Sequence, residues 1–516
     1  KSKRVIALLL EGKEADSANE AYTLQAGPEG VQIKASSLHG IFNGIQTLRQ
    51  LMQTGRWVKS CHIYDWPAFS WRGYMIDVGR NYMPMNLLKQ QIEVMAAYKL
   101  NIFHFHATED IAWRWYINRY PQLTEAQNML RNKGSYYSEK EIKELIEFCR
   151  QRYIQFVPEI DMPGHSAAFR RAMHTDMQSD SGMLMVKNIL EEIVQRYDLP
   201  YIHIGADEVK ISNKRFIPEM TEFLQQRGKK LIGWEPGGNF LPGTIRQLWM
   251  DDQAFMKEDA QIQFIDSRHL YLNHMDPLEA VTTIYNRMIG NKPKGDSSLL
   301  GATLCMWNDR RVDKPADILR MNPVYSGMLA FAERLWQGGG QKGWISNISD
   351  GNIHAFEAFE QRLIRHKKRY FADKPFPYYA QLQQRWHLLG PFPNGGNLSN
   401  KMPVESNSLL YDTATFASVT GGTVVLRHWW YPLIKGAVQQ PKESSTVYAY
   451  TRLWSNSDTV QDFWIGFNDL SRSPATDSPP EGEWDAKMSR IWLNGQPIDP
   501  PHWLHGGQKG NSEVPL

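Results

Sequence analysis

Short apolar runs alternate with amphipathic helical stretches between residues 66 and 375, and this rhythm constrains the fold more than any other feature. Eight such runs can be read from the chain: Gly73–Val78, Asn101–His106, Ile154–Ile160, Tyr201–Ile204, Lys230–Trp234, Thr244–Trp249, Ile262–Asp266 and Leu300–Met306. Between them, Asn86–Tyr98 and Ser138–Arg150 carry apolar residues at helical spacing. Because parallel strands need a crossover connection, this alternation predicts a parallel sheet. Its length and repeat number favour a (β/α)8 barrel. An open doubly wound sheet is the rival, but no Gly-rich phosphate-binding turn supports it.

The segment before this region predicts a small α+β domain at residues 1–65. Strands are expected at Val5–Leu10, Ala21–Gln25 and Val31–Ala35, and a helix at His39–Gln53. The step Asp65-Trp66-Pro67 breaks the pattern and marks a domain boundary.

The barrel domain is expected to cover residues 66–375 and to close with helices at Pro323–Leu335 and His354–Lys368. From residue 385 to 516 helical periodicity is lost. Strand-like alternation appears at Thr446–Leu453, Val460–Phe467 and Ser489–Leu493, and Asn494-Gly495 is a hairpin signal. We therefore predict a C-terminal β-sandwich-like domain whose last element we expect to be incomplete at Leu516.

Composition excludes several classes of protein. The chain of 516 residues has 58 basic and 55 acidic residues mixed along its length, so no basic stripe indicates nucleic acid as a partner. No apolar run reaches the length of a membrane span. The three cysteines are isolated, which favours neither a disulfide framework nor a zinc site. The chain begins at Lys1 and shows no signal peptide, so we read it as a mature or trimmed form of an exported protein. Its oligomeric state is not indicated.

Functional side chains follow the predicted strands, and in such barrels the active site lies at the carboxyl ends of the strands. Acidic groups, histidines, an arginine and aromatic rings share this position: Asp77, Arg80, His104, His106, Glu109, Asp110, Glu159, Asp161, His165, Asp207, Glu208, Trp234, Glu235, Trp249, Tyr271, Asn273, Trp307, Asn308 and Asp309. Carboxylates beside aromatic walls are typical of glycoside chemistry, whereas a phosphate site would need more cationic groups.

The doublet Asp207-Glu208 is the sharpest feature of this set. Taken alone, adjacent acidic residues at a strand end are typical of a helix N-terminus, which carboxylates cap and stabilise. Here the doublet follows the small residues Gly205 and Ala206, which let the backbone open at the rim. We therefore interpret the pair as candidate catalytic groups.

The surrounding stretch, His203-Ile204-Gly205-Ala206-Asp207-Glu208-Val209, resembles the His-Ile-Gly-Gly-Asp-Glu-Val motif of family 20 glycoside hydrolases, the β-N-acetylhexosaminidases, in their bacterial form. Other stretches resemble further parts of this family in the same order: Trp71-Arg72-Gly73 through Asp77-Val78-Gly79-Arg80, Asn101–His106, Glu159–His165, Tyr271-Leu272-Asn273, Cys305-Met306-Trp307 and Ala332–Trp336. Residues 1–65 resemble the small domain that precedes these barrels. The resemblance covers roughly residues 20–340.

The resemblance implies an exo-acting enzyme that removes a terminal β-linked N-acetylglucosamine or N-acetylgalactosamine from the non-reducing end of a glycan. It also implies substrate-assisted retention, in which the substrate's own acetamido oxygen attacks the anomeric carbon and forms an oxazolinium intermediate. Glu208 would then be the general acid and base, and Asp207 would hold the acetamido N–H and stabilise its developing charge. Tyr271 would donate its hydroxyl to the acetamido oxygen. No cofactor or metal is implied.

The remaining roles are implied one residue at a time. Arg80 would hold hydroxyl groups of the terminal sugar, and Asn273 and Asp309 would bind those on its far edge. Three indoles would wall the pocket: Trp234, Trp249 and Trp307. His165 resembles the histidine that sits behind the acid/base and sets its pKa, although a histidine after Pro-Gly is also typical of a turn.

The chain departs from the family pattern at three of these positions. Glu109 stands where the family has the aspartate partner of His165, so either Glu109 or Asp110 would complete that relay. Ala206 replaces a glycine and restricts the backbone beside the catalytic pair. Asp309 stands where many relatives have glutamate, so the preference between gluco, galacto and 6-sulfated sugars stays open.

Two other classes of protein compete with this interpretation. His104 and His106 lie on one face of a strand, and together with His165 or His203 they suggest a metal-dependent hydrolase. Packing of the two histidines inside the barrel is the plainer explanation. The second rival is a glycan-binding protein without activity. Trp429, Trp430 and Trp454 of the C-terminal domain would serve either glycan binding or core packing.

Overall fold

The computed structural model describes residues 5–11, 19–52, 57–251, 262–348, 351, 353–428, 430–460, 462–463, 465–467, 482–485, 487–500 and 502. The chain forms two compact units. The first comprises residues 1–271, 288–307 and 331–340, and the second comprises 272–287, 308–330 and 341–516. The predicted boundaries near residues 65 and 375–385 stay predictions.

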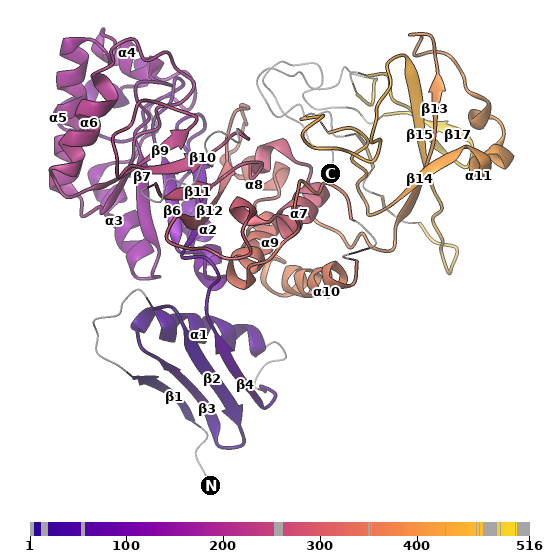
Figure 1. Ribbon diagram of the computed structural model, residues 1–516, viewed down its shortest axis with the longest axis horizontal. Helices are drawn as coiled ribbons and strands as arrows, with labels where there is room; N and C mark the ends of the chain where they lie inside the picture. The colour runs from indigo at the N-terminus through magenta and orange to yellow at the C-terminus, as the bar shows by residue number, and fades with distance from the viewer. Residues whose placement is uncertain are drawn as a thin grey trace. The chain divides into compact units, whose positions relative to one another are not determined.

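The first unit begins with a small α+β domain. Its sheet has the order β1-β3-β2-β4, formed by β1 (Val5–Leu10), β2 (Tyr22–Gly27), β3 (Gly30–Ala35) and β4 (Cys61–Asp65). β1 runs parallel to β3, and β2 runs antiparallel to both β3 and β4. Helix α1 (Leu38–Leu51) covers one face of the sheet (Figure 1), where Leu24 and Ile33 are buried. Strand β4 escaped the sequence analysis because its alternation spans only five residues.

The predicted (β/α)8 barrel is confirmed. A closed parallel barrel contains β5 (Trp71–Asp77), β6 (Ile102–His106), β7 (Gln155–Glu159), β8 (Tyr201–His203), β9 (Lys230–Glu235), β10 (Ile245–Leu248), β11 (Phe264–Asp266) and β12 (Leu299–Met306). β12 pairs with β5 and β10 pairs with β9, which closes the ring. Every residue of β5 is buried, as expected where helices cover the outside and side chains fill the interior.

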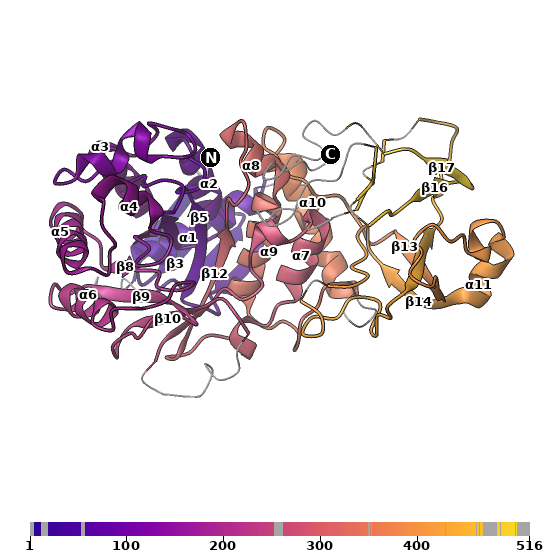
Figure 2. The same cartoon turned by 90° about the horizontal axis from the view of Figure 1, so that it is seen from above.

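Helices surround the strands (Figure 2). The first unit includes α2 (Met85–Ala97), α3 (Glu139–Arg150), α4 (Ala167–Met173), α5 (Asp180–Arg196) and α6 (Phe216–Gln225). Helix α3 starts at a capping box, in which Ser138 accepts from the Glu141 N–H and Glu141 accepts from the Ser138 N–H. Inside the barrel, a layer of apolar side chains fills the end at which the strands begin: Trp71, Ile102, Val157, Ile232, Ile245 and Ile265. Polar groups are therefore left to the carboxyl ends.

The second unit includes α7 (Pro277–Asn286), α8 (Pro315–Met321) and α10 (Ile353–Tyr370), whereas α9 (Val324–Gln337) has residues in both units. Short 3-10 helices occur along the chain at Pro121–Thr124, Ala126–Asn128, Leu272–His274, Ile289–Asn291, Pro403–Glu405 and Ser408–Leu410. In the part of the chain that the structure describes, every helix is too short or too polar to pass through a lipid bilayer.

The C-terminal region is built from strands, as predicted, and the sandwich is supported in part. An antiparallel sheet has the order β14-β13-β15, formed by β13 (Arg385–Pro393), β14 (Thr415–Thr420) and β15 (Ser445–Thr451), beside the short helix α11 (Tyr411–Ala414). β16 (Ile491–Leu493) and β17 (Gln496–Ile498) form the hairpin predicted from Asn494-Gly495, and both turn residues have positive φ. The strand predicted at Val460–Phe467 is wrong for its described residues, which form no strand; 461 and 464 lie outside them.

Candidate active site

The predicted polar residues gather at the carboxyl ends of the barrel strands. Asp77 ends β5, Glu159 ends β7 and His203 ends β8. His104 and His106 lie two residues apart on β6, so both face the interior. In parallel register, Asp77 pairs with His106, His106 pairs with Glu159, and Glu159 pairs with His203. Four neighbouring strands therefore bring their last side chains to one level of the barrel.

Glu159 is the centre of this layer. Its Oε2 lies 2.8 Å from His104 Nε2 and 2.8 Å from His106 Nδ1. Its Oε1 accepts a hydrogen bond of 2.8 Å from the Trp234 indole. Burial alone would raise the pKa of this carboxyl group, but the neighbouring histidines hold the pKa well below its usual value. Glu159 is therefore an ionised carboxylate that orients an indole and two imidazoles.

The two histidines of β6 differ in charge. Burial lowers the pKa of His104 to about 4, which leaves it neutral. For His106 burial acts in the same direction, but the charge of Glu159 and hydrogen bonds to Glu109 and Glu159 raise its pKa well above the ordinary value. His106 is therefore a cation enclosed by carboxylates.

These contacts bear on the rival metal site. Three groups have ligand atoms close enough to hold an ion by spacing alone: His104, Glu159 and His203; His106, Glu159 and Asp161; and Glu109, Asp110 and His165. Neighbouring ligands of a tetrahedral zinc ion with bonds near 2.05 Å stand about 3.3 Å apart. His104 Nε2 forms a direct hydrogen bond of 2.8 Å with Glu159, and His106 Nδ1 lies at the same distance from the carboxylate as an ion pair, closer than two ligands of one zinc ion would stand. The geometry of the β6 histidines thus fits hydrogen-bonded packing.

The loop after β8 carries the acidic doublet in a strained backbone. Gly205, Ala206 and Glu208 have φ values of 64°, 80° and 50°. The Ala206 N–H points to Asp161 Oδ1 at 3.4 Å, and a Cβ on Gly205 would lie 1.8 Å from the same oxygen. The glycine is therefore required by the close approach of Asp161. Left-handed backbone at non-glycine residues is typical of functional sites.

The members of the doublet have different environments. Burial, followed by the charges of Asp161 and Glu159, raises the pKa of Asp207 well above its ordinary value. Asp161 is itself buried, which raises its pKa to about 6. Glu208 is 53% exposed, and its hydrogen bond to His165 lowers its pKa. Neighbouring carboxyl groups thus have pKa values shifted in opposite directions, as is common at catalytic sites.

His165 connects Glu208 to the acidic loop after β6. Its Nε2 lies 3.2 Å from Glu208 Oε2, and its Nδ1 lies 3.3 Å from Glu109 Oε1. Burial opposes a charge on His165, but the hydrogen bonds to Glu109 and Glu208 outweigh it and raise its pKa to about 12. Asp110 is farther away, at 4.0 Å, and its Oδ1 accepts from the Ala167 N–H at the start of α4. The longer Glu109 side chain therefore occupies the relay position, and Asp110 caps a helix.

Arg80 is held on the same side. Its guanidinium donates to Asp77 Oδ2 at 2.8 Å and pairs with Glu109 Oε1 at 2.7 Å. Its Cζ also lies 5.3 Å from the centre of the Trp307 ring. The arginine is thus fixed between the relay and the aromatic residues.

The predicted aromatic residues come together around Met75 and Cys305. Trp249, Tyr271 and Trp307 are partly exposed and pack against these buried side chains and Trp234. The Trp307 ring lies 5.9 Å from Tyr271 and 5.7 Å from Trp234. Trp234 is only 1% exposed, so it lies behind Trp307 and does not face an open pocket.

Tyr271 lies within electrostatic reach of the acidic doublet. Burial raises the pKa of Tyr271 well above its ordinary value, and the charges of Cys305, Asp207 and Glu208 add to the effect. Its hydroxyl therefore stays protonated and available as a donor. Asn273 and Asp309 belong to the second unit, where Asn273 Nδ2 donates to Asp309 Oδ2 at 2.7 Å.

Sequence reasoning assigned no role to Glu159 or Asp161 and considered His106 only for packing or the rival metal site, although all three stand among the strand-end residues. The sequence did carry a signal for this layer: Glu159 ends one predicted strand, and His104 and His106 lie two positions apart on the strand before it. Their importance depends on the register between strands, which the sequence does not show.

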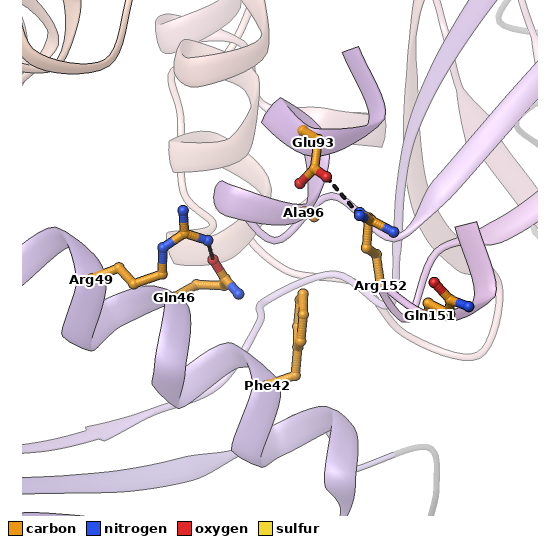
Figure 3. A pocket seen from close by; sticks show the side chains of 7 residues that line it. All are labelled: Phe42, Gln46, Arg49, Glu93, Ala96, Gln151 and Arg152. Carbon is orange, nitrogen blue, oxygen red and sulfur yellow. Dashed lines mark hydrogen bonds and ion pairs between the residues drawn. The ribbon is translucent and has the colours of Figure 1, made fainter. Parts of the chain in front are cut away.

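A separate hollow lies at the opposite end of the barrel. It has a volume of about 270 Å³ and is lined by Phe42, Gln46, Arg49, Glu93, Ala96, Gln151 and Arg152. Side chains of α1 face those of α2 and of the turn after α3 across it (Figure 3). The α2 and α3 residues precede the beginnings of β6 and β7, so this hollow is at the amino ends of the strands and holds none of the predicted site residues.

Comparison with protein families matches two consecutive parts of the chain. Residues 1–66 match domain 2 of glycosyl hydrolase family 20, and residues 69–230, which contain the doublet and β5 to β8, match the catalytic domain of the same family. Both matches are to glycosyl hydrolase family 20.

Individual relatives agree with this family 20 assignment. A β-hexosaminidase of Porphyromonas gingivalis is 29% identical over 404 residues, which are 61% of this chain and 51% of that protein. The chain spans about half the length of the first curated relatives it matches.

Solved structures of family 20 members share the fold. The β-N-acetylhexosaminidase from Bacteroides fragilis aligns with a TM-score of 0.57 at 26% identity and covers 69% of this chain and 84% of that one. The N-acetyl-β-hexosaminidase of Streptomyces plicatus in complex with Thio-NAglucal aligns with a TM-score of 0.60 at 25% identity, over 73% and 84% of the two chains.

Proposed function

We propose that this family 20 chain is an exo-acting β-N-acetylhexosaminidase that removes terminal β-linked N-acetylglucosamine or N-acetylgalactosamine from glycans by substrate-assisted, retaining hydrolysis. The observation that carries the proposal is the Asp207-Glu208 pair, which has opposite pKa shifts at a strained strand end. The relatives named β-hexosaminidase support the substrate class.

Asp207 is the group that recognises the acetamido N–H. It is half-buried among carboxylates and lies within electrostatic reach of the Tyr271 hydroxyl. An ionised Asp207 would orient the amide and stabilise the positive charge that develops as its oxygen attacks the anomeric carbon. Tyr271 would donate to that oxygen. Because attack is intramolecular, orientation contributes on the order of 7–11 kcal/mol to lowering the barrier.

Glu208 is the group that protonates the leaving oxygen and later activates water. Its exposure suits contact with the leaving group, and His165 behind it controls its proton. The pKa shifts place the first proton on Asp207, whereas the reaction needs it on Glu208. Substrate would reverse this order, because the acetamido N–H stabilises ionised Asp207 and the sugar removes water from Glu208.

The other residues keep their proposed roles. Arg80 would bind sugar hydroxyl groups beside the ring of Trp307, and Trp249 would complete the wall with Trp234 behind it. Asn273 and Asp309 would bind hydroxyl groups at the far edge of the sugar. We further propose that the protein is exported. Trp454 is 91% exposed, which favours glycan contact over core packing for this residue; Trp429 lies outside the described residues.

The test uses two isosteric variants and two substrates. Glu208→Gln should lower kcat on an alkyl N-acetyl-β-glucosaminide by about 10²–10⁴-fold, and less on the p-nitrophenyl glycoside, whose leaving group needs no acid. Asp207→Asn should strongly lower kcat on both substrates, because the hydrolysis of both relies on the acetamido group. Unchanged turnover by Asp207→Asn would exclude the assisted mechanism.

The same assay separates the rival classes. A wild-type protein that binds the sugar without cleaving any N-acetylhexosaminide would be a glycan-binding protein. We expect a chelator to leave activity unchanged, and a loss restored by a divalent metal would favour a metal-dependent hydrolase instead. Glu219→Ala, which removes a partly buried ion pair with Lys187 at 2.7 Å, is a control for unspecific effects.

A further inference from the structure

A buried ionic cluster joins the ends of β10 and β11. Arg268, two residues after β11, donates to Asp266 Oδ1 at 2.8 Å from Nε and to Asp266 Oδ2 at 3.2 Å from Nη2. Asp266 is completely buried and also accepts from the Gly290 N–H at 2.7 Å. The guanidinium is thereby locked to the end of β11, because both donors and both acceptors are engaged.

The same guanidinium also reaches the segment after β10. Arg268 Nη1 donates to Asp251 Oδ1 at 3.1 Å, and His269 Nε2 lies 2.8 Å from Asp251 Oδ2. The Asp251 side chain is only 11% exposed, and the consecutive residues Arg268 and His269 contact both of its carboxylate oxygens. Buried charge-assisted hydrogen bonds of this kind are stronger and more rigid than exposed ion pairs.

The two segments that the cluster joins carry two of the proposed substrate-binding rings. Trp249 precedes Asp251 by two residues, and Tyr271 follows His269 by two residues. Each residue is also held by a second contact. The Trp249 indole donates to the Pro236 carbonyl oxygen at 2.9 Å, and the backbone of Tyr271 forms a β-bridge with Cys305 of β12.

His269 makes the connection strained as well as tight. Its φ of 55° lies in the left-handed region, within the turn that leads from β11 to Tyr271. Such a conformation persists only where surrounding contacts hold it. The contact of His269 with Asp251 is one of those that define the course of the chain into Tyr271.

We propose that Asp251, Arg268 and His269 form a positioning cluster that sets the distance between the rings of Trp249 and Tyr271, and with it the shape of the recess for the acetamido group. None of the three needs to touch the substrate. The inference rests on the proposed function, because the proposed function is what places the rings of Trp249 and Tyr271 at the acetamido recess. Misplacement of a substrate-orienting group by about 1 Å can lower the rate about 10²-fold.

The experiment compares Asp251→Asn and Arg268→Lys with the wild type on the p-nitrophenyl N-acetyl-β-glucosaminide. Both variants keep a polar side chain of similar length, but each weakens the hydrogen bonds that hold the side chain at position 251 from two sides. We expect kcat/KM to fall about 10- to 100-fold. The affinity for a thiazoline that mimics the cyclised acetamido group should fall by a similar factor, while the affinity for a simple alkyl glucoside, which lacks that group, should not change. The unfolding midpoint of Asp251→Asn should stay close to that of the wild type, whereas Arg268→Lys also loses donors to the buried Asp266 and should lower it.

A double-mutant cycle tests whether Asp251 acts through Tyr271. If it does, the fold-loss in kcat/KM of the double variant Asp251→Asn with Tyr271→Phe should be much smaller than the product of the two single fold-losses. The matched control is Glu219→Ala, an ion-pair deletion with no connection to either ring.

The outcomes separate this inference from the proposed function. Wild-type kinetics and thiazoline affinity in Asp251→Asn, with an active parent enzyme, would overturn the positioning role alone. Losses that multiply in the double variant, or that follow a lowered unfolding midpoint of Asp251→Asn, would also overturn it by showing a general structural effect. Absence of hydrolysis by the wild type would instead contradict the proposed function.

Discussion

At the scale of the residue, the proton distribution between Asp207 and Glu208 is the property most closely connected to the proposed reaction. Burial and nearby carboxylates raise the pKa of Asp207, whereas the hydrogen bond to His165 lowers that of Glu208. A productive pair holds one proton, so a doubly protonated and a fully ionised pair are both inactive. The pH dependence of kcat/KM should then be bell-shaped, and its limbs belong to the pair as a whole.

His165→Asn should move both limbs of this bell to higher pH. His165 has a pKa raised to about 12 and is therefore a cation across the working range. Its charge lowers the pKa of both Asp207 and Glu208, so removing the charge raises both values. The measurement is kcat/KM for the p-nitrophenyl substrate as a function of pH. His174→Asn, at the exposed and left-handed end of α4, is the control and should leave the bell in place. A shift to lower pH would contradict the assigned role.

At the scale of the element, the loop after β8 decides whether the doublet can face the site. Three of its residues have positive φ, and the loop is packed so closely on Asp161 that position 205 has no room for a side chain. By contrast, Ala206 tolerates its conformation at an energetic cost that a glycine would avoid. The strain is therefore concentrated next to the acidic doublet.

Gly205→Ala should destabilise the protein by more than about 2 kcal/mol and abolish most activity, because its Cβ would lie 1.8 Å from Asp161 Oδ1 and φ is 64°. Ala206→Gly is the paired variant. Relief of left-handed strain and the added entropy of the unfolded chain nearly offset one another, so its stability should change by less than about 1 kcal/mol. Thermal unfolding and kcat measure both effects. Equal behaviour of the two variants would show that Asp161 does not restrict the loop.

At the scale of the whole molecule, a polar network ties the small α+β domain to the barrel inside the first unit. Asp65 of β4 accepts from the Tyr22 hydroxyl at 2.6 Å and from the Trp336 indole at 2.8 Å. Lys99, at the end of α2, lies 3.4 Å from the same carboxylate and 4.1 Å from the centre of the Trp336 ring. Burial lowers the pKa of Lys99 to about 8, and Asp65 opposes that shift.

Asp65→Ala should lower the stability of the first unit by about 2–3 kcal/mol, because it leaves a buried hydroxyl, an indole and an ammonium group without their common acceptor. The unfolding midpoint in urea measures this loss. Glu147→Ala, which removes a surface pair with the exposed Arg150, should cost less than about 0.5 kcal/mol. A loss in Asp65→Ala no larger than that of the control would mean that the network does not hold the domains together.

Much of the fold could be predicted because its signals are local. The β12 strand, for example, is a single apolar run from Leu299 to Met306, and such runs can be recognised without knowing their partners. β13 was missed because Arg385–Pro393 contains glycine and proline, and Val460–Phe467 was assigned wrongly because alternation alone does not provide a pairing partner. The doublet was found because its two members are adjacent, with a characteristic sequence around them.

What the sequence determined by itself is the order of strands and helices and the identity of the side chains at each strand end, since both depend on neighbouring residues. The tertiary structure decided which of those side chains meet. The partners of Glu159 come from β6 and β9, the relay position fell to Glu109 instead of Asp110, and Trp234 lies behind the wall. Register between strands, burial and summed charge set these outcomes, and all three arise from residues that are far apart in the chain.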